Sequence, residues 1–412
     1  MGKRKDDIKI GRAMDKEAKS NSGRNPLLLV AVSGLRAALF PIPIITIFWK
    51  EQIGISFTDI MLLQSIFGAA VVLLEFPSGY VADRLGYRLS LLAGASFWAA
   101  GWTVYALGTT FAAMVFAEIL LGIGFAFTSG ADSALLYVSL KGDNDISQYV
   151  VWEGRVRAAA QISEAASSGM GGWLYSISPR LPFWLQLPVA VSGLAAVTAT
   201  REVYVEQTEE RIKHLARSWH IVRHALGRHA RLRSAMILSV ALGISTYVPV
   251  WLIQPWMQQR GIPLAWFGPL WAIAHVWLAA ASLLSGKIGE LLGIRAALFI
   301  CCWLAGISYL GLGLSTAAAG VIFYLGFMTV RGLQGPLLTT VLQADAPPED
   351  RASVLSLNAL LFRLAAVVIL PPVGALVDRW GLENVLQWLA LIIGITAFPA
   401  WALFARTHSK HE

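Results

Sequence analysis

Charged side chains are scarce in this sequence. Only 14% of the 412 residues are Asp, Glu, Lys or Arg, whereas soluble domains carry about 25%. Because a water-soluble protein of this size needs more polar surface, the composition excludes an ordinary soluble globule. The hydrophobic residues, 56% of the chain, occur in long runs. Each run is long enough to cross ~30 Å of hydrocarbon as a helix.

Cysteine and catalytic motifs are scarce as well. The two cysteines, Cys301 and Cys302, are neighbours. On a helix they point in different directions, so we expect neither a disulfide nor a metal site. The sequence contains no GxxxxGK[ST] loop for ATP, and its apolar runs carry no nucleophile–base pair. We therefore expect no enzyme, no metal and no cofactor, and any transport must be driven by an ion gradient or by the substrate's own gradient.

Twelve apolar runs follow one another along the chain. Their length predicts an all-α integral membrane protein with twelve transmembrane helices. The runs are centred near Ala37, Gly68, Ala99, Phe125, Glu164, Gly193, Gly243, Ala274, Cys302, Phe327, Ala366 and Ile393.

The positive charges are distributed unevenly between these runs. Most of the 33 Lys and Arg lie before the first run, after the last run and in alternate loops between them. Positively charged loops stay in the cytoplasm, so we predict a bacterial inner-membrane protein with both termini cytoplasmic. Loops that face anionic lipid headgroups explain the net charge of +8. We therefore expect the lipid bilayer, and no nucleic acid, as a partner.

A short motif returns along the chain. The stretch "SGYVADRLGYR" from Ser78 is repeated as "SGKIGELLGIR" from Ser285, about half the chain later. A third copy, "VGALVDRWGLE", begins at Val373. Membrane transporters are often built from internal repeats with substrate sites where the repeats meet. The motif therefore predicts two pseudo-symmetric six-helix bundles.

The repeats and the charged stretches define the predicted domains. We predict cytoplasmic tails over residues 1–25 and 406–412, an N-terminal bundle over 26–203 and a C-terminal bundle over 233–405. The linker over 204–232 has an apolar stripe flanked by arginines, which indicates an amphipathic helix on the inner membrane face. We expect the protein to be a monomer.

The first copy of the motif resembles the signature of the major facilitator superfamily, G-x-x-x-D-R-x-G-R-R, between the second and third helices. Tyr87 replaces the first Arg of the final pair. The resemblance implies a twelve-helix secondary transporter of that fold, in which this loop is a gate. The gating residues carried over from the signature and its second copy are Gly79, Asp83, Arg84, Gly86, Arg88, Gly286, Glu290 and Arg295.

The residue types of the signature have physical roles of their own. Gly79 has no side chain and predicts close packing of a neighbouring helix. Gly86 permits a tight turn. Asp83 ends a helix whose own dipole disfavours an anion, so it needs a partner. That partner is either Arg88 or, as the resemblance implies, the start of the helix that follows Pro347.

Six ionisable side chains fall within the apolar runs, where each costs about 2.5–3.5 kcal/mol on insertion scales. They are Arg36, Glu118, Asp132, Glu164, Arg331 and Arg363. In a structural interpretation they form buried pairs, such as Arg36 with Glu118 or Glu164. In a functional interpretation an acid carries a proton and an arginine binds an anionic substrate. The resemblance implies that the first, fourth, seventh and tenth helices line the cavity, where Tyr247, Trp251 and Gln254 would complete the pocket.

These observations predict a secondary active transporter of a small organic molecule, coupled to protons. The signature is prominent in drug exporters, which favours export by antiport. The alternative is uptake of an anionic metabolite bound by Arg331 and Arg36. An alternative of another class is a membrane sensor or scaffold that transports nothing, and the charged residues in the predicted cavity argue against it.

Overall fold

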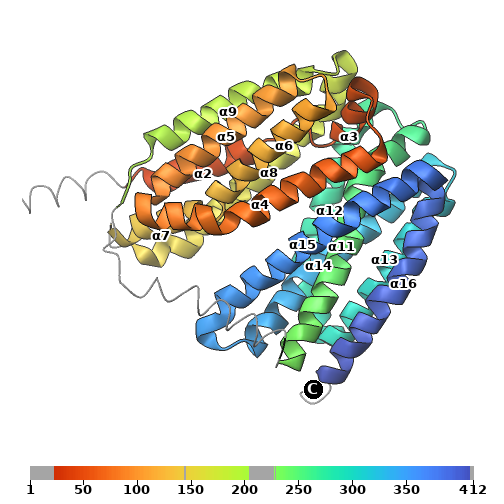
Figure 1. The fold of residues 1–412 in the computed structure, drawn as a ribbon. Coiled ribbons are helices and arrows are strands. Elements are labelled where there is room, and N and C mark those ends of the chain that lie inside the picture. Colours follow the sequence, from red (N-terminus) through yellow and green to blue (C-terminus); the bar gives the residue numbers. More distant parts are fainter. Residues whose placement is uncertain (1–22, 143–144, 204–226, 228, 409–412) are drawn as a thin grey trace, which may run out of the picture. The chain divides into compact units, whose positions relative to one another are not determined.

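A computed structural model describes residues 23–142, 145–203, 227 and 229–408. Every regular element in these ranges is a helix (Figure 1), so the predicted all-α fold is confirmed. The predicted linker helix over 204–232 lies almost wholly outside the described residues. So do residues 1–22 and 409–412 of the two predicted tails.

The helices follow the apolar runs closely. In the first half of the chain they are α2 (Asn25–Ala37), α3 (Ile45–Phe48), a π-helical turn (Trp49–Ile53), α4 (Phe57–Leu85), α5 (Tyr87–Leu107), α6 (Phe111–Thr128), α7 (Ala131–Gly142), α8 (Tyr149–Ile177) and α9 (Leu181–Ala199). In the second half they are α11 (Ala230–Gln259), α12 (Phe267–Leu292), α13 (Ile294–Leu314), α14 (Ile322–Asp345), α15 (Arg351–Trp380) and α16 (Leu382–Thr407).

Nine helical segments within the described ranges are long and apolar enough to cross a membrane. One of them, Phe111–Gly142, contains both α6 and α7. α5 and α8 are as long as several of the nine but less apolar, and α2 is a shorter apolar helix. A helical membrane protein is therefore supported, while the exact count of twelve spans stays a prediction.

The chain divides into two compact units. Among the described residues, the first unit comprises the segment up to Ile42, the segment 70–170 and the segment from Arg180 to Val203. The second comprises 43–69, 171–179 and the helices from α11 onward. The division runs through α4 and α8, and not only between the predicted bundles 26–203 and 233–405. The predicted domain boundaries therefore remain a prediction.

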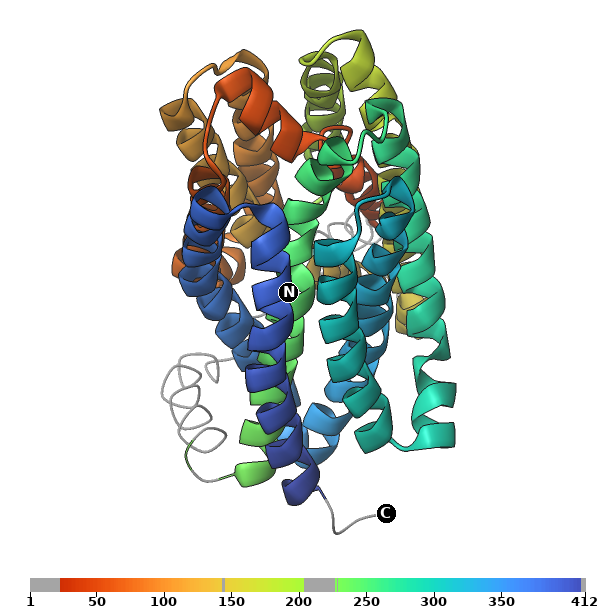
Figure 2. The same cartoon turned by 90° about the vertical axis from the view of Figure 1, so that its right-hand side faces the viewer.

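Close helix packing forms the core of each unit. In the first unit α5 packs between α6 and α9, and a Cβ added at Gly94 of α5 would lie 2.4 Å from Oγ1 of Thr128. In the second unit α11 packs against α14 and α16, and Figure 2 shows α11 in green beside α16 in dark blue. A Cβ added at Gly332 of α14 would lie 2.6 Å from the carbonyl oxygen of Leu278 in α12. Small residues at these positions allow the helix backbones to approach closely.

Candidate functional site

Arg36 and Asp132 each lie at a break within a predicted span. α2 ends one residue after Arg36, where the sequence "FPIP" follows. Each proline of that stretch lacks an N–H group and clashes with the preceding helical turn. α6 and α7 are separated at Gly130, whose φ of +80° favours glycine. Arg36 therefore lies in the last turn of one half-helix, and Asp132 lies in the first turn of another.

The two side chains form an ion pair. Nη2 of Arg36 donates to Oδ2 of Asp132 at 3.1 Å, and the two side chains are 33% and 18% exposed. Each charge lies at the helix end that favours it, the cation at the carboxyl end of α2 and the anion at the amino end of α7. The guanidinium keeps its proton under all ordinary conditions, whereas the carboxylate can gain one. The pair therefore joins a permanent cation to an ionisable acid.

A chain of polar contacts continues from Asp132 into α8. Oδ1 of Asp132 accepts the backbone N–H of Ser133 at 2.8 Å. Oγ of Ser133 lies 3.3 Å from each carboxylate oxygen of Glu153, and Nε of Arg157 donates to Glu153 at 3.2 Å. With Arg36, the chain holds two cations and two anions. Sequence reasoning treated the positive charges of this segment as loop charges, although their i,i+4 spacing with Glu153 was a usable signal.

A buried amide supports the break that follows α2. Gln186 of α9 is fully buried. Its Nε2 donates to the carbonyl oxygen of Ala38 at 2.9 Å, and its Oε1 accepts the N–H of Phe40 at 3.2 Å. Backbone groups outside a helix need partners when they are buried, and this one side chain satisfies two of them. Sequence reasoning missed Gln186, although a lone amide within the apolar run "FWLQLPVAV" was a signal.

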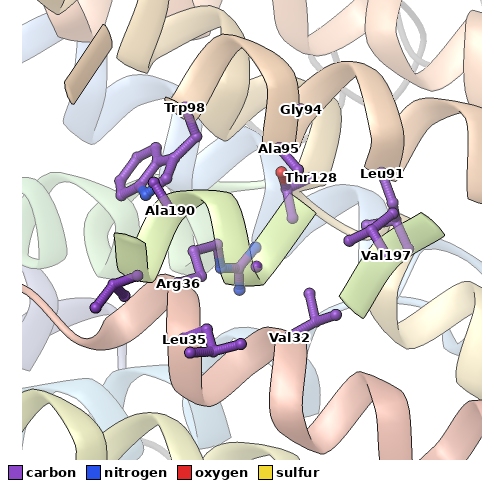
Figure 3. A pocket seen from close by; sticks show the side chains of 12 residues that line it. Val32, Leu35, Arg36, Leu91, Gly94, Ala95, Trp98, Thr128, Ala190 and Val197 are labelled. Atoms are coloured by element: carbon purple, nitrogen blue, oxygen red, sulfur yellow. The ribbon is translucent and has the colours of Figure 1, made fainter. Parts of the chain in front are cut away.

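A small cavity lies beside Arg36 within the first unit (Figure 3). Its volume is about 30 Å³, close to the share of one water molecule in the liquid. Arg36, Trp98 and Thr128 line it together with apolar side chains of α2, α5 and α9. The buried indole nitrogen of Trp98 has no hydrogen-bond partner among the described residues. The cavity therefore places a second face of Arg36 next to a space of water size.

The other two predicted acids lie elsewhere in the first unit. Glu118 of α6 is buried and accepts a hydrogen bond from the hydroxyl of Tyr105 in α5. Glu164 of α8 is half-buried. Among the described residues, the ion pair of Arg36 is with Asp132, and not with Glu118 or Glu164 as the structural interpretation expected. The observed pair joins the last turn of α2 to the first turn of α7.

Three predicted pocket residues lie on α11 in the second unit. Trp251 and Gln254 are buried; α3 contacts Gln254, and the π-helical turn that follows α3 contacts Trp251. Oε1 of Gln254 accepts the N–H of Thr46 at 2.9 Å, and the rings of Trp251 and Trp49 lie 6.1 Å apart. The ring of Tyr247 meets Trp251 edge-on. These side chains form a packed layer here, and their contact with a substrate stays a prediction.

Arg331 of α14 differs from Arg36 in its contacts. Its side chain is exposed and makes no hydrogen bond or ion pair with any described residue. It shares an exposed stripe with Gly335 and Thr339, whereas the adjacent Gly332 packs against α12. A permanent cation in a membrane helix needs a counter-charge. Arg363 of α15 is half-buried, and its role stays a prediction.

The signature loop is held to the end of α9. The carboxylate of Glu202 accepts the N–H groups of Tyr87 at 3.0 Å and Arg88 at 2.9 Å, which caps the amino end of α5. The guanidinium of Arg88 donates to the carbonyl oxygens of Thr200 at 2.7 Å and Thr198 at 2.8 Å. Arg88 therefore anchors the loop within the first unit, and the role of Glu202 was missed because it lies far along the chain.

The glycines of the signature adopt the predicted tight turn but do not show the predicted close packing. Gly86 adopts φ +106°, and Gly293 of the second copy adopts φ +77°, as the tight turn predicts. A Cβ added at Gly79 or at Gly286 would meet no described atom within 4 Å, so the close packing predicted at Gly79 is not found among the described residues.

The remaining gating residues lie at helix ends. Asp83, Arg84 and Glu290 are exposed, and Arg295 is half-buried. The carbonyl oxygen of Arg295 accepts the indole N–H of Trp401 at 2.9 Å. Their part in a gate stays a prediction.

The apolar helices and the repeated loop are consistent with the family that a comparison with known protein families identifies. The model of the Major Facilitator Superfamily matches residues 27–369. The chain belongs to this superfamily. The resemblance that the signature loop carried is thereby confirmed, and the family is one of transporters.

Two curated proteins show what this chain is similar to. The raffinose permease of Escherichia coli is 24% identical over 149 residues, which cover 35% of this chain and 34% of the permease. The MFS-type transporter ppzB of Metarhizium majus (strain ARSEF 297) is 26% identical over 163 residues, 36% of this chain and 34% of ppzB. Each match spans about a third of the relative's length.

Solved structures match over far more of the chain. The nucleoside transporter NupG aligns with a TM-score of 0.78 at 14% identity, covering 92% of this chain and 99% of NupG. A POT family transporter in complex with 5-aminolevulinic acid aligns with a TM-score of 0.74 at 15% identity, covering 93% and 97%. At these identities the likeness shows the fold alone.

Proposed function

We propose that this protein is a proton-coupled secondary active transporter of a small organic molecule. The Arg36–Asp132 pair carries the proposal, because it joins a titratable acid to a permanent cation at the ends of two half-helices. Transporters often build substrate and ion sites from discontinuous helices near the bilayer midplane. Both side chains are partly exposed, so a proton or a substrate can reach them.

The chemistry of the pair favours exchange of a substrate for protons. A cationic group on a substrate and a proton compete for the same carboxylate, Asp132, so that binding of one releases the other. Such competition is the minimum that an antiporter needs. We therefore favour export of a small organic molecule by proton antiport, with Arg36 as the cation that neutralises Asp132 when neither is bound.

A second candidate function is uptake of an anionic metabolite together with protons. The observation that favours it is the exposed, unpaired side chain of Arg331, for which no counter-charge exists among the described residues. Protonation of Asp132 would also leave Arg36 without its counter-ion. A carboxylate or phosphate on the substrate suits either guanidinium, because its planar fork binds two oxygens at once.

We place the transporter in a bacterial inner membrane, as a monomer with both termini cytoplasmic and no nucleic-acid partner. The basic residues in alternate loops support this orientation. In it, the end of α4 that begins at Phe57 faces away from the cytoplasm, and the signature loop between α4 and α5 faces the cytoplasm.

The signature loop completes the proposal as a gate. Asp83, exposed near the carboxyl end of α4, is disfavoured by the dipole of its own helix. We expect it to contact the amino end of α15 in one conformation of the cycle and to leave it in another. The anchored Arg88 and the turn at Gly86 keep the loop in place throughout.

The test is a ligand screen followed by flux. Purified protein is screened by thermal shift against cationic drugs and organic anions. Raffinose and nucleosides are included because two matched proteins are named for them, and 5-aminolevulinic acid because a third was solved in complex with it. Compounds that raise the melting temperature are then tested in proteoliposomes with and without a pH gradient. We expect flux of one class to follow the gradient. A protein that binds a compound but moves none would be a sensor or scaffold.

A further inference from the structure

The amino end of α4 is capped from two sides. Within its own sequence, Oγ of Ser56 accepts the N–H of Asp59, and the carboxylate of Asp59 accepts the N–H of Ser56, both at 3.1 Å. This reciprocal capping box satisfies two of the four N–H groups that a helix start leaves free. The N–H groups of Phe57 and Thr58 remain, and they are satisfied by another helix.

Asp378, near the end of α15, takes both remaining groups. Its Oδ1 accepts the N–H of Phe57 at 2.9 Å, and its Oδ2 accepts the N–H of Thr58 at 2.8 Å. The hydroxyl of Thr58 donates to Oδ2 at 2.6 Å. A carboxylate at a helix amino end is favoured by the helix dipole and by charge-assisted hydrogen bonds. All of these residues belong to the second unit.

Shape complements this charge contact. A Cβ added at Gly374, one turn before Asp378, would lie 2.5 Å from the carbonyl oxygen of Phe57 and 2.8 Å from Cα of Thr58. At Gly374, which has no side chain, the backbone of α15 therefore lies directly against the first turn of α4. The ammonium of Lys50 lies 3.8 Å from the centre of the Phe57 ring. Burial lowers the pKa of Lys50, and the negative charge of Asp378 opposes that shift.

The sequence around Asp378 is the third copy of the repeated motif. Gly374, Asp378 and Gly381 occupy the places that Gly79, Asp83 and Gly86 hold in the first copy. The turn geometry repeats as well, since Gly381 adopts φ +82° and Gly86 adopts φ +106°. The two copies differ in the packing around their first glycine. Gly374 of the third copy is packed against α4, whereas a Cβ at Gly79 would meet no described atom within 4 Å.

We infer that Gly374 and Asp378 form a releasable latch on the first turn of α4, and that Asp378 is a positioning residue of the transport cycle. This inference rests on the proposed function. The latch is releasable because its hydrogen bonds to Thr58 are solvent-exposed, and because the capping box keeps the helix start intact when Asp378 leaves. α4 runs from the second unit into the first, so a contact that fixes its first turn biases a change between conformations.

The experiment measures the distance between the two partners directly. Spin labels are placed at Gln52→Cys and Arg379→Cys, both exposed, with the buried Cys301 and Cys302 changed to Ala. Distance distributions are recorded by pulsed electron resonance on the full chain in lipid nanodiscs, without substrate. We expect a short distance to dominate, and Asp378→Asn to lower the ratio of short to long distances about threefold, the size expected for an anion at an exposed helix amino end.

Two further variants and two controls make the result specific. Gly374→Ala should separate the helices by steric contact with Phe57, and Thr58→Val should act in the same direction by removing one hydrogen bond. Glu383→Gln, which removes an acid bound to Arg260, and Gly394→Ala on α16, where a Cβ meets no described atom within 4 Å, should leave the distribution unchanged.

An unchanged distribution in Asp378→Asn and Gly374→Ala would overturn the inference and leave a static helix cap. So would an equal shift in both controls. Because no substrate is present, the outcome is separate from that of the proposed function. A shifted distribution in a protein that transports no compound would retain the latch and refute transport.

Discussion

One residue, Asp132, joins Arg36 to the rest of the polar chain in the first unit. Asp132 and Arg36 could both be selected from the sequence as candidates, because a charge within an apolar run needs a reason. Their pairing could not be predicted. It depends on two helix breaks and on contacts between α2 and α7, so that Glu118 and Glu164 were equally plausible partners from the sequence. Gln186 and Glu202 were missed for the same reason, since each acts on backbone groups far along the chain.

The exposed Arg331 gives a prediction about stability and affinity together. Arg331→Ala should leave the melting temperature of the ligand-free protein within about a degree or two, because no ion partner among the described residues loses its counter-charge. Affinity for an anionic ligand should fall about tenfold or more. Arg331→Lys should restore only part of it, because the ammonium lacks the planar fork. A large loss of melting temperature with unchanged affinity per folded molecule would instead indicate a structural ion pair.

Gln186 gives a prediction about the broken helix. Gln186→Leu keeps the approximate volume of the side chain but leaves the backbone groups of Ala38 and Phe40 without partners. We expect a loss of about 2 kcal/mol or more in the free energy of unfolding, the cost of leaving buried polar groups unsatisfied. The matched control is Gln161→Leu on the exposed face of α8. Equal denaturation midpoints for the two variants would show that the break needs no support.

At the scale of elements, the positions of the helices could be predicted and their breaks could not. Nearly every run that length and hydrophobicity predicted to be a helix forms one in the structure. Proline alone does not mark a break here, because Pro77, Pro188 and Pro249 lie inside continuous helices. The break after α2 needs the two prolines of "FPIP" together with a buried amide that accepts the released backbone. The buried amide comes from another helix, α9, so the local sequence around the break does not reveal it.

Packing between α12 and α14 gives a prediction with a control on the same helix. Gly332→Ala places a Cβ 2.6 Å from the carbonyl oxygen of Leu278, a backbone atom that cannot rotate away. We expect a loss of about 1–3 kcal/mol in stability, as for other overpacked sites. Gly335→Ala, three residues later, meets no described atom within 4 Å and should be neutral or slightly stabilising. Thermal melts of the two variants in the same detergent decide the matter. Similar melting temperatures would show that α12 and α14 are not tightly packed at Gly332.

At the scale of the whole molecule, the signature loop, its repeats and the twelve apolar runs together predicted the family and the fold. Three copies of one motif, each with a glycine that adopts a positive φ, agree with a chain built from related halves. The family model bears out the predicted family, and the solved structures bear out the predicted fold. The division into units could not be read from the repeats, because contacts assign the first part of α4 and the last part of α8 to the second unit. The repeats are defined by sequence similarity, whereas the units are defined by contacts between packed helices.

The central claim is that Asp132 couples proton movement to transport through its pair with Arg36. The most direct measurement compares wild type and Asp132→Asn in proteoliposomes, for a substrate found by the ligand screen. Two rates are recorded: transport driven by a pH gradient, and exchange of labelled for unlabelled substrate at equal pH. We predict that Asp132→Asn loses gradient-driven transport at least tenfold but retains exchange, because the amide cannot carry the proton. Gradient-driven transport at the wild-type rate in Asp132→Asn would contradict the account.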